Sequence, residues 1–364
     1  MTKVLLWGAS IHKDERGTKI IEPKIIKGYS GVCVQACIGG NYVLVLNELG
    51  EVFSMGSGSG GRLGHGSTED YKQFKKIGFG NSIIVSISAG DWNASAVDSL
   101  GNVYIWGKFG QDVLAPIKVE ISELAVRSES GHQYTAILTD RDHLYFFGSN
   151  TDGKCGKKPS STVEPYEFSL VELYPDEDDT FCDVSCGYHH TLVCSKKTGR
   201  VYSFGNNIDG QCGNGKKKTK SAPPSAVVLP EVQLLDQRIT LILLLYLLME
   251  KCLRGDAQLQ KGSGYKHKLG NGSDKDELTP IKVDFFGNEI KAQKFVSGGI
   301  HSQVLDVNNN LYSFGCGSDG RLGHPEGEGH RYLYKEGVPK LIESIKGSVL
   351  HVDSGYYHVI AVCK

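Results

Sequence analysis

Three histidines recur at one position of a repeated pattern and are the first candidates for chemistry. His190, His301 and His358 each open an apolar run three residues after a glycine. A ring of imidazoles could transfer protons, but such catalysis needs a serine, cysteine or carboxylate at a fixed offset, and the pattern supplies none. We therefore expect these histidines to bond backbone groups of adjacent units. The sequence predicts no catalytic residue and no enzyme.

Two glycine-rich stretches are similar to phosphate-binding loops. One runs from Gly210 to Lys217 and the other from Gly56 to Gly61. A phosphate loop needs Ser or Thr after its lysine and a helix N-terminus beyond it, whereas Lys218 and then prolines follow the first stretch. Both stretches are better explained as tight turns, which glycine permits. No cofactor is therefore expected.

Cysteines occur in two pairs with a separation of four residues, Cys33 with Cys37 and Cys182 with Cys186. In an extended strand this separation corresponds to about 13 Å, too far for two ligands of one tetrahedral zinc. We expect structural cysteines, no metal site, and the reduced thiols of an intracellular protein in the cytoplasm, the nucleus or both. The opening residues, MTKVLLWG, form too short an apolar run for a signal peptide.

These candidate residues are positioned by a repeat that runs through almost the whole chain. Each copy has three apolar runs. The first run ends in glycine and is joined to the second by a short turn. A hairpin turn joins the second run to the third, which ends in a dipeptide of a large residue, usually aromatic, followed by glycine. The period is near 50 residues, as in solenoids and propellers. A fourth, proline-led run in several copies predicts an outermost strand. The seven dipeptides are Trp7-Gly8, Met55-Gly56, Trp106-Gly107, Phe147-Gly148, Phe204-Gly205, Lys261-Gly262 and Phe314-Gly315.

The two ends of the chain distinguish a ring from a solenoid. The stretch from Gly355 to Cys363 supplies the front half of a copy, and Lys3 to Gly8 supplies a back half. A ring needs such a unit joined from both ends, and this closure also removes the exposed sheet edge. We therefore predict an all-β fold, a seven-bladed β-propeller with four-stranded blades whose last blade is closed by the N- and C-terminal strands. Residues 1–364 would form a single domain.

One copy departs from the pattern, and its blade, around residues 239–272, is expected to be degenerate. Residues 239–260 contain neither the glycine turn nor the hairpin turn of the other copies. The segment is as long as the matching part of the preceding copy, but its residues do not fit the repeat. It is therefore either a reading-frame error in the recorded sequence or a blade with replaced inner strands. Its 11-residue apolar run is too short to cross a membrane, which takes roughly 17 to 25 residues, and no membrane association is expected.

The repeat resembles that of the regulator-of-chromosome-condensation family. The resemblance is carried by Ser88-Ala89-Gly90 with residues 101–107 (GNVYIWG), by 61–66 (GRLGHG), by 297–302 (SGGIHS) and by 320–324 (GRLGH). It implies a seven-bladed propeller. Family members include an exchange factor for the GTPase Ran, a plant ultraviolet photoreceptor and many protein-binding propellers, so the fold alone does not fix the function.

The resemblance also indicates where a partner would bind. Exchange-factor members carry an acidic residue just before the repeat histidine, on the rim that faces the GTPase, and none of the matching residues here is acidic; Asp91 lies one place earlier. A photoreceptor of this family would need a cluster of tryptophans in these turns, whereas Trp92 is the only one there. The predicted partner-binding rim comprises Asn41, Asp91, Trp92, Gln133, His189, Ile300 and Tyr357.

The charge distribution gives little global preference for a partner. Forty Lys and Arg residues nearly balance 41 Asp and Glu residues, so charged recognition must be local and binding to nucleic acid or chromatin is not expected. A basic loop of Lys216, Lys217, Lys218 and Lys220 is either a solvated run or an import or phosphate-contacting signal. We expect a monomeric scaffold that binds a protein partner through its rim loops. The alternative is guanine nucleotide exchange on a Ran-like or other small GTPase.

Overall fold

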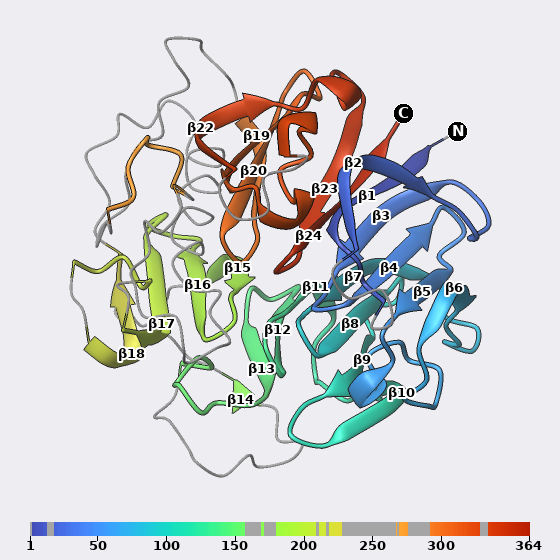
Figure 1. The fold of residues 1–364 in the computed structure, drawn as a ribbon. Helices are drawn as coiled ribbons and strands as arrows, with labels where there is room; N and C mark the ends of the chain where they lie inside the picture. Colours follow the sequence, from blue (N-terminus) through green and yellow to red (C-terminus); the bar gives the residue numbers. More distant parts are fainter. Residues whose placement is uncertain are drawn as a thin grey trace.

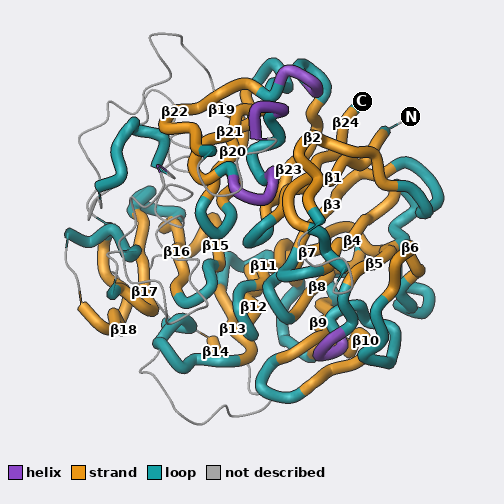
Figure 2. Tube along the Cα trace, viewed as in Figure 1, coloured by secondary structure: helices purple, strands orange, loops and turns teal. Residues whose placement is uncertain are grey.

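The structure, a computed structural model, describes residues 2–12, 18–156, 169–170, 180–208, 211–215, 218–227, 267, 269–275, 292–327 and 334–364. In this part of the chain the strands form six antiparallel, four-stranded sheets arranged around a central axis (Figure 1). Short 3-10 turns and loops connect them (Figure 2). These are η2 (Ser59–Gly61), η5 (Ser318–Gly320), η6 (Pro325–Gly327) and η7 (Glu343–Ile345).

Each sheet is one blade, and its strands follow one another from the axis to the outside. Three blades come from the first part of the chain. Their strands are β3 (Cys33–Ile38), β4 (Tyr42–Asn47), β5 (Val52–Gly56) and β6 (Tyr71–Lys76); β7 (Ile84–Ala89), β8 (Asn93–Asp98), β9 (Val103–Lys108) and β10 (Asp112–Val119); and β11 (Ala125–Ser130), β12 (Tyr134–Thr139), β13 (Leu144–Gly148) and β14 (Ser169–Leu170).

The other three blades follow the same order, and the last of them combines both ends of the chain. Their strands are β15 (Phe181–Cys186), β16 (His190–Ser195), β17 (Val201–Asn207) and β18 (Lys218–Ala226); β19 (Ala292–Ser297), β20 (His301–Asp306), β21 (Leu311–Cys316) and β22 (Lys335–Leu341); and β23 (Val349–Ser354), β24 (His358–Cys363), β1 (Lys3–Ala9) and β2 (Lys19–Ile26).

Closure by both termini is confirmed, because β1 pairs with β24 along its length. Leu5 lies opposite Ala361 and Leu6 opposite Ile360, and the two ends lie side by side in Figure 1. The prediction of seven blades is wrong, since the described residues form six sheets. Most of the copy expected at 239–272 lies outside the described residues. Its sequence lacks the glycine and hairpin turns that in the other copies join the inner strands.

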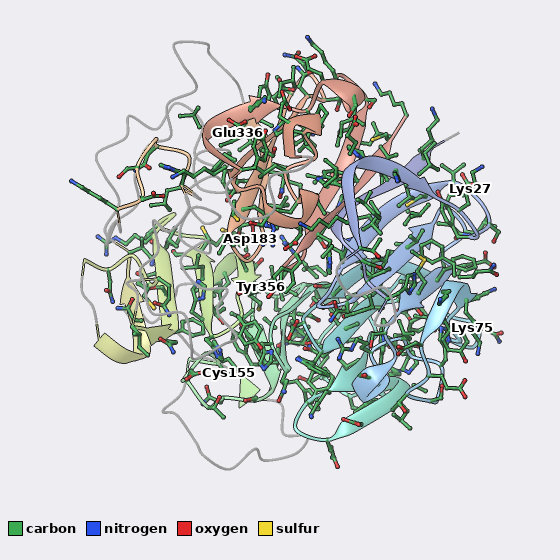
Figure 3. All side chains as sticks on the ribbon, in the orientation of Figure 1. Lys27, Lys75, Cys155, Asp183, Glu336 and Tyr356 are labelled. Carbon is green, nitrogen blue, oxygen red and sulfur yellow. The ribbon has the colours of Figure 1, made fainter. Side chains whose placement is uncertain are left out.

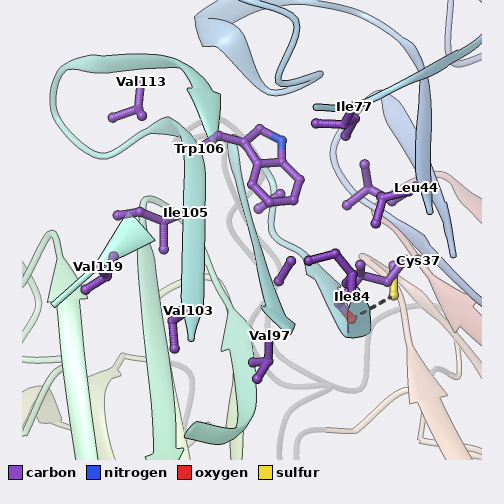
Figure 4. Close-up of a cluster of buried hydrophobic side chains, with 14 of the residues drawn as sticks. Cys37, Leu44, Ile77, Ile84, Val97, Val103, Ile105, Trp106, Val113 and Val119 are labelled. Carbon is purple, nitrogen blue, oxygen red and sulfur yellow. Dashed lines mark hydrogen bonds between the residues drawn. The ribbon is translucent and has the colours of Figure 1, made fainter. Parts of the chain in front are cut away.

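The blades stack face to face, so the middle strands are buried on both sides. All six residues of β4, and likewise of β8, are buried. Figure 4 shows one such interface, in which Trp106 packs beside Ile77 and Leu44 of the preceding blade. The Trp106 indole donates a hydrogen bond to the carbonyl oxygen of Arg62 at 3.0 Å. Each blade therefore completes the core of its neighbour.

A series of close glycine contacts holds the inner ends of the blades together. In five of the six described blades, the glycine after the inner strand lies so near the next blade that an added Cβ would crowd the following glycine's carbonyl oxygen. This holds for Gly39 against Gly90, Gly90 against Gly131, Gly131 against Gly187, Gly298 against Gly355, and Gly355 against Gly39. At these five positions glycine is required both by close packing between blades and by the side chain of the last residue of its own turn, which an added Cβ would also crowd.

We expect Gly90→Ala to lower the free energy of unfolding by about 1–3 kcal/mol, because the new methyl group overlaps the Gly131 carbonyl and forces the blades apart. Gly78→Ala is the matched control, since a Cβ there meets nothing within 4 Å, and this change should be neutral or slightly stabilising. Urea denaturation of both variants measures the difference. Equal midpoints for the two variants would contradict this account of the glycines.

Candidate functional site

A cavity of about 310 Å³ lies on the axis, and the six inner strands form its wall. We call it the channel. The turns that follow these strands surround one mouth of the channel, and we call this surface the turn rim. Figure 3 places Tyr356 of the turn rim and Asp183 of an inner strand near the centre of the ring. The turns comprise residues 39–42, 90–93, 131–134, 187–190, 298–301 and 355–358.

The last residue of each turn is buried, and in five of the six turns its side chain bonds to the next blade. The Tyr42 hydroxyl lies 3.0 Å from the Gly90 carbonyl oxygen and 2.7 Å from that of Asn93. His358 occupies the equivalent position and its Nε2 lies 3.0 Å from the Gly39 carbonyl oxygen. Burial lowers the pKa of His358 to about 4, so the imidazole is neutral at pH 7. This geometry fits a structural role for the repeat position and offers no acid–base site there.

Two aromatic residues of the turn rim rest on buried arginines. The guanidinium of Arg62, itself 2% exposed, lies 3.8 Å from the centre of the Trp92 ring. Arg321 lies beneath Tyr357 in the same way, at 5.0 Å. A cation held against an aromatic face contributes about 0.5–2 kcal/mol. The arginines therefore fix the orientation of two partly exposed rings at the surface.

A second chain of contacts links three consecutive turns. The Asp91 carboxylate lies 3.2 Å from His132 Nδ1, and the His132 ring stacks on Tyr188 with ring centres 3.8 Å apart. His189, beside Tyr188, lies 2.7 Å from the Asp152 carboxylate. Asp91 is thus engaged within the turn rim, and a small GTPase would have to compete with His132 for it.

The structure brings the predicted rim residues to the turn rim, and their part in binding stays a prediction. Asn41 and Tyr357 are exposed, whereas Gln133, Ile300 and the others are half-buried. The basic loop is elsewhere: Lys218 and Lys220 belong to the outermost strand β18, while Lys216 and Lys217 lie outside the described residues.

Charged side chains also line the channel, well below the turn rim. Arg127 pairs with Asp183 at 2.6 Å and with Glu129 at 3.3 Å. Lys294 donates hydrogen bonds to the Val352 carbonyl oxygen at 2.8 Å and lies 3.0 Å from His351 Nε2. Burial raises the pKa of Glu129 and lowers the pKa of Lys294. The channel is therefore polar, with both signs of charge.

Sequence reasoning missed several residues of this site. Apart from Asp91, it took the third residue of each turn as the rim, whereas the second residues His132, Tyr188 and Tyr356 line the mouth of the channel together with Asp91. It also missed the buried cations beneath the turns. A signal for these was available, because Arg62 and Arg321 occupy the same place in two matching GRLG tetrapeptides.

In the described residues, no group of three or more His, Cys, Asp or Glu side chains is placed to hold a metal ion. Nor does this part of the chain contain a helix of the length and apolarity needed to span a bilayer.

Comparison with known sequences identifies the repeat. Profiles of the Regulator of chromosome condensation (RCC1) repeat match residues 50–97, 198–241 and 308–362, and a second profile of the same repeat matches 181–211. The chain is 27% identical over 350 residues to the Ultraviolet-B receptor UVR8 of Arabidopsis thaliana, covering 88% of this chain and 73% of the receptor. It is 26% identical over 236 residues to the human E3 ubiquitin-protein ligase HERC2, covering 59% of this chain but only 5% of HERC2.

Comparison with solved structures shows the same fold. Prp20p from Saccharomyces cerevisiae, studied for its binding to Gsp1p and histones, superposes with a TM-score of 0.76 at 17% identity. The match covers 100% of this chain and 91% of Prp20p. At this identity the likeness extends to the fold alone.

The buried Lys154 beneath the turn rim makes stability depend on pH. Its ammonium donates a hydrogen bond to the His132 carbonyl oxygen at 2.8 Å, and burial lowers its pKa to about 8. Above pH 8 the folded chain loses this proton while the unfolded chain, with an ordinary lysine pKa of about 10.4, retains it. The unfolded state then binds more protons, so the free energy of unfolding rises with pH.

We expect the free energy of unfolding of the native chain, relative to Lys154→Met, to rise between pH 8 and 10 by up to about 1.4 kcal/mol per pH unit. Below pH 8 the difference between the two proteins should be constant, since both states of the native chain are protonated. Urea denaturation of both proteins at several pH values measures this difference. A flat difference from pH 7 to pH 10 would contradict the lowered pKa.

Proposed function

The chain belongs to the family of proteins built from RCC1 repeats, and we propose on this premise that it is a protein-binding propeller whose partner docks on the turn rim. The observation that carries the proposal is the set of partly exposed aromatic side chains around the channel mouth. Aromatic residues are enriched in protein interfaces, where they supply large contact areas. The set comprises Trp92, Tyr188, Tyr356 and Tyr357.

The turn rim is also rigid, which favours recognition. Buried arginines hold Trp92 and Tyr357 from beneath, and His132 is fixed between Asp91 and Tyr188. A rigid side chain loses less conformational entropy when a partner binds, so more of the contact energy becomes affinity. Loops carried on a stiff scaffold are common sites of recognition for this reason.

Nucleotide exchange on a small GTPase is the second candidate. It is supported by the fold shared with Prp20p, which was studied for its binding to Gsp1p. Against it stands the turn rim itself, where Asp91 is the acidic residue among the turn positions and is already paired with His132 at 3.2 Å. We therefore place protein binding first and exchange second.

Site-specific photocrosslinking tests where the partner docks. A photoreactive p-benzoylphenylalanine replaces Tyr357, which is 40% exposed on the turn rim, or Leu100, which is 73% exposed on the opposite rim. We expect crosslinked products from position 357 that are absent at position 100. The opposite rim also exposes Val85 and Val126, so it is the natural competing surface. Crosslinks from position 100 alone would place the partner there and overturn the proposal.

Release of labelled GDP from a panel of small GTPases tests the second candidate. We expect no acceleration by the intact chain, because Asp91 is engaged by His132. The control is Asp91→Asn, which keeps the size of the side chain and removes its charge. Acceleration by the native chain that Asp91→Asn abolishes would establish exchange and displace the first proposal.

A further inference from the structure

We propose that the mouth of the channel receives a basic side chain, a lysine or an arginine, from the partner that docks on the turn rim. This inference rests on the proposed function and deepens it.

The charges in the channel lie in two layers. Each inner strand has six residues, and its third and fifth residues line the cavity in most blades. The fifth residues are nearer the turn rim and include Glu129 and Asp353. The third residues are deeper and include Arg127 and Lys294, together with Asp183, whose carboxylate pairs with Arg127. At the rise of a β-strand, two residues separate the layers by about 7 Å. A group entering from the turn rim therefore meets carboxylates before it meets cations.

The fold does not require a carboxylate in the outer of these layers. The remaining blades of the described structure carry small or neutral side chains at the same position, namely Cys37, Ser88, Ser185 and Val296. Glu129 and Asp353 thus depart from the pattern that suffices for the architecture. Burial raises the pKa of both carboxyl groups, which shows that the charged forms lack full compensation.

The cations already present leave these carboxylates open to a guest. Arg127 is shared between Glu129 and Asp183. Asp353 accepts a hydrogen bond from the Ile38 amide at 2.9 Å, and among the described residues Lys294 attracts its charge from beyond ion-pair distance. Lys294 is directed instead to the Val352 carbonyl and His351. A guest cation would therefore gain contacts with two carboxylates that the protein's own cations satisfy incompletely.

The mouth itself suits a cation more than an anion. His132, Tyr188 and Tyr356 line it together with the Asp91 carboxylate. Aromatic faces attract ammonium and guanidinium groups, and an anion would have to pass Asp91, Glu129 and Asp353 before reaching Lys294. Lysine and arginine both carry their charge on a long, narrow stem, which lets the head enter while the backbone stays on the turn rim.

Binding of small analogues tests the inference without knowledge of the partner. The probes are n-butylamine and ethylguanidine, which carry the lysine and arginine head groups, with butyrate as the matched anion at equal ionic strength. Saturation-transfer NMR with the intact chain measures their dissociation constants. We expect the two cations to bind more tightly than butyrate, and the double variant Glu129→Gln/Asp353→Asn to weaken them about tenfold, as loss of charge-assisted hydrogen bonds implies.

Matched controls separate the channel from general electrostatics and from misfolding. Asp112→Asn/Glu343→Gln removes the same net charge from exposed positions and should leave the dissociation constants unchanged. Tyr356→Ala removes a ring at the mouth without altering the buried charges, and should also weaken the cations. Equal binding of butylamine and butyrate, or equal weakening by both double variants, would overturn the inference.

This outcome is separable from that of the docking proposal. The amine titrations report on the channel alone, and crosslinking from position 357 reports on the turn rim alone. A crosslinked partner together with no preference for cations would refute the channel inference and leave docking in place. Preferential cation binding without any crosslink from position 357 would refute docking on the turn rim, and with it the assignment of the cation to a docked partner.

Discussion

The close approach of glycine to carbonyl between adjacent blades is the constraint on which the rest of this structure depends. Gly39, Gly90, Gly131, Gly298 and Gly355 each lie where a side chain would crowd the backbone of the next blade. The contact sets the spacing of the inner strands, and with it the width of the channel. In five of the six turns the buried residue at the end of the turn also bonds across the same boundary, as Tyr134 does to Gly187 and His190. The outer strands are free of this constraint and vary in length.

The same packing explains why the turn rim can hold varied side chains. The backbone of each turn is fixed by its glycine and by its last residue. The two residues between them therefore have no structural role that is shared by all the turns. Buried cations support them from below: Arg62 reaches Trp92, Arg321 reaches Tyr357, and Lys154 reaches the His132 carbonyl. A buried cation is costly unless its donors are satisfied. Here the backbone carbonyls and aromatic faces of the turns satisfy part of the donors of these cations. The same contacts hold the carbonyls and rings of the turns in place.

The fixed spacing of glycines and aromatic residues, together with the proline-led runs, was enough to predict the four-stranded sheets and the joining of the two ends. The spacing is fixed because two strands joined by a short turn have nearly the same length in each copy. It was not enough to predict six sheets, since the count included the copy at 239–272, where only the tail of the repeat matches. The polar channel was also missed. A register shift near the start of each inner strand, as between Cys33 and Gln35, breaks simple alternation, so the side that Gln35 or Arg127 faces cannot be read from period two.

Comparison of the copies within this one chain separates structure from function. Positions that recur, such as the turn glycines and the buried residues at 42, 134, 190, 301 and 358, all serve contacts between blades. Positions that differ from copy to copy are not needed for these contacts between blades. The third turn residues are Asn41, Trp92, Gln133, His189, Ile300 and Tyr357, six different types at equivalent places. A symmetric scaffold gains a specific surface only by such differences, so selectivity for a partner must reside in the residues that break the repeat.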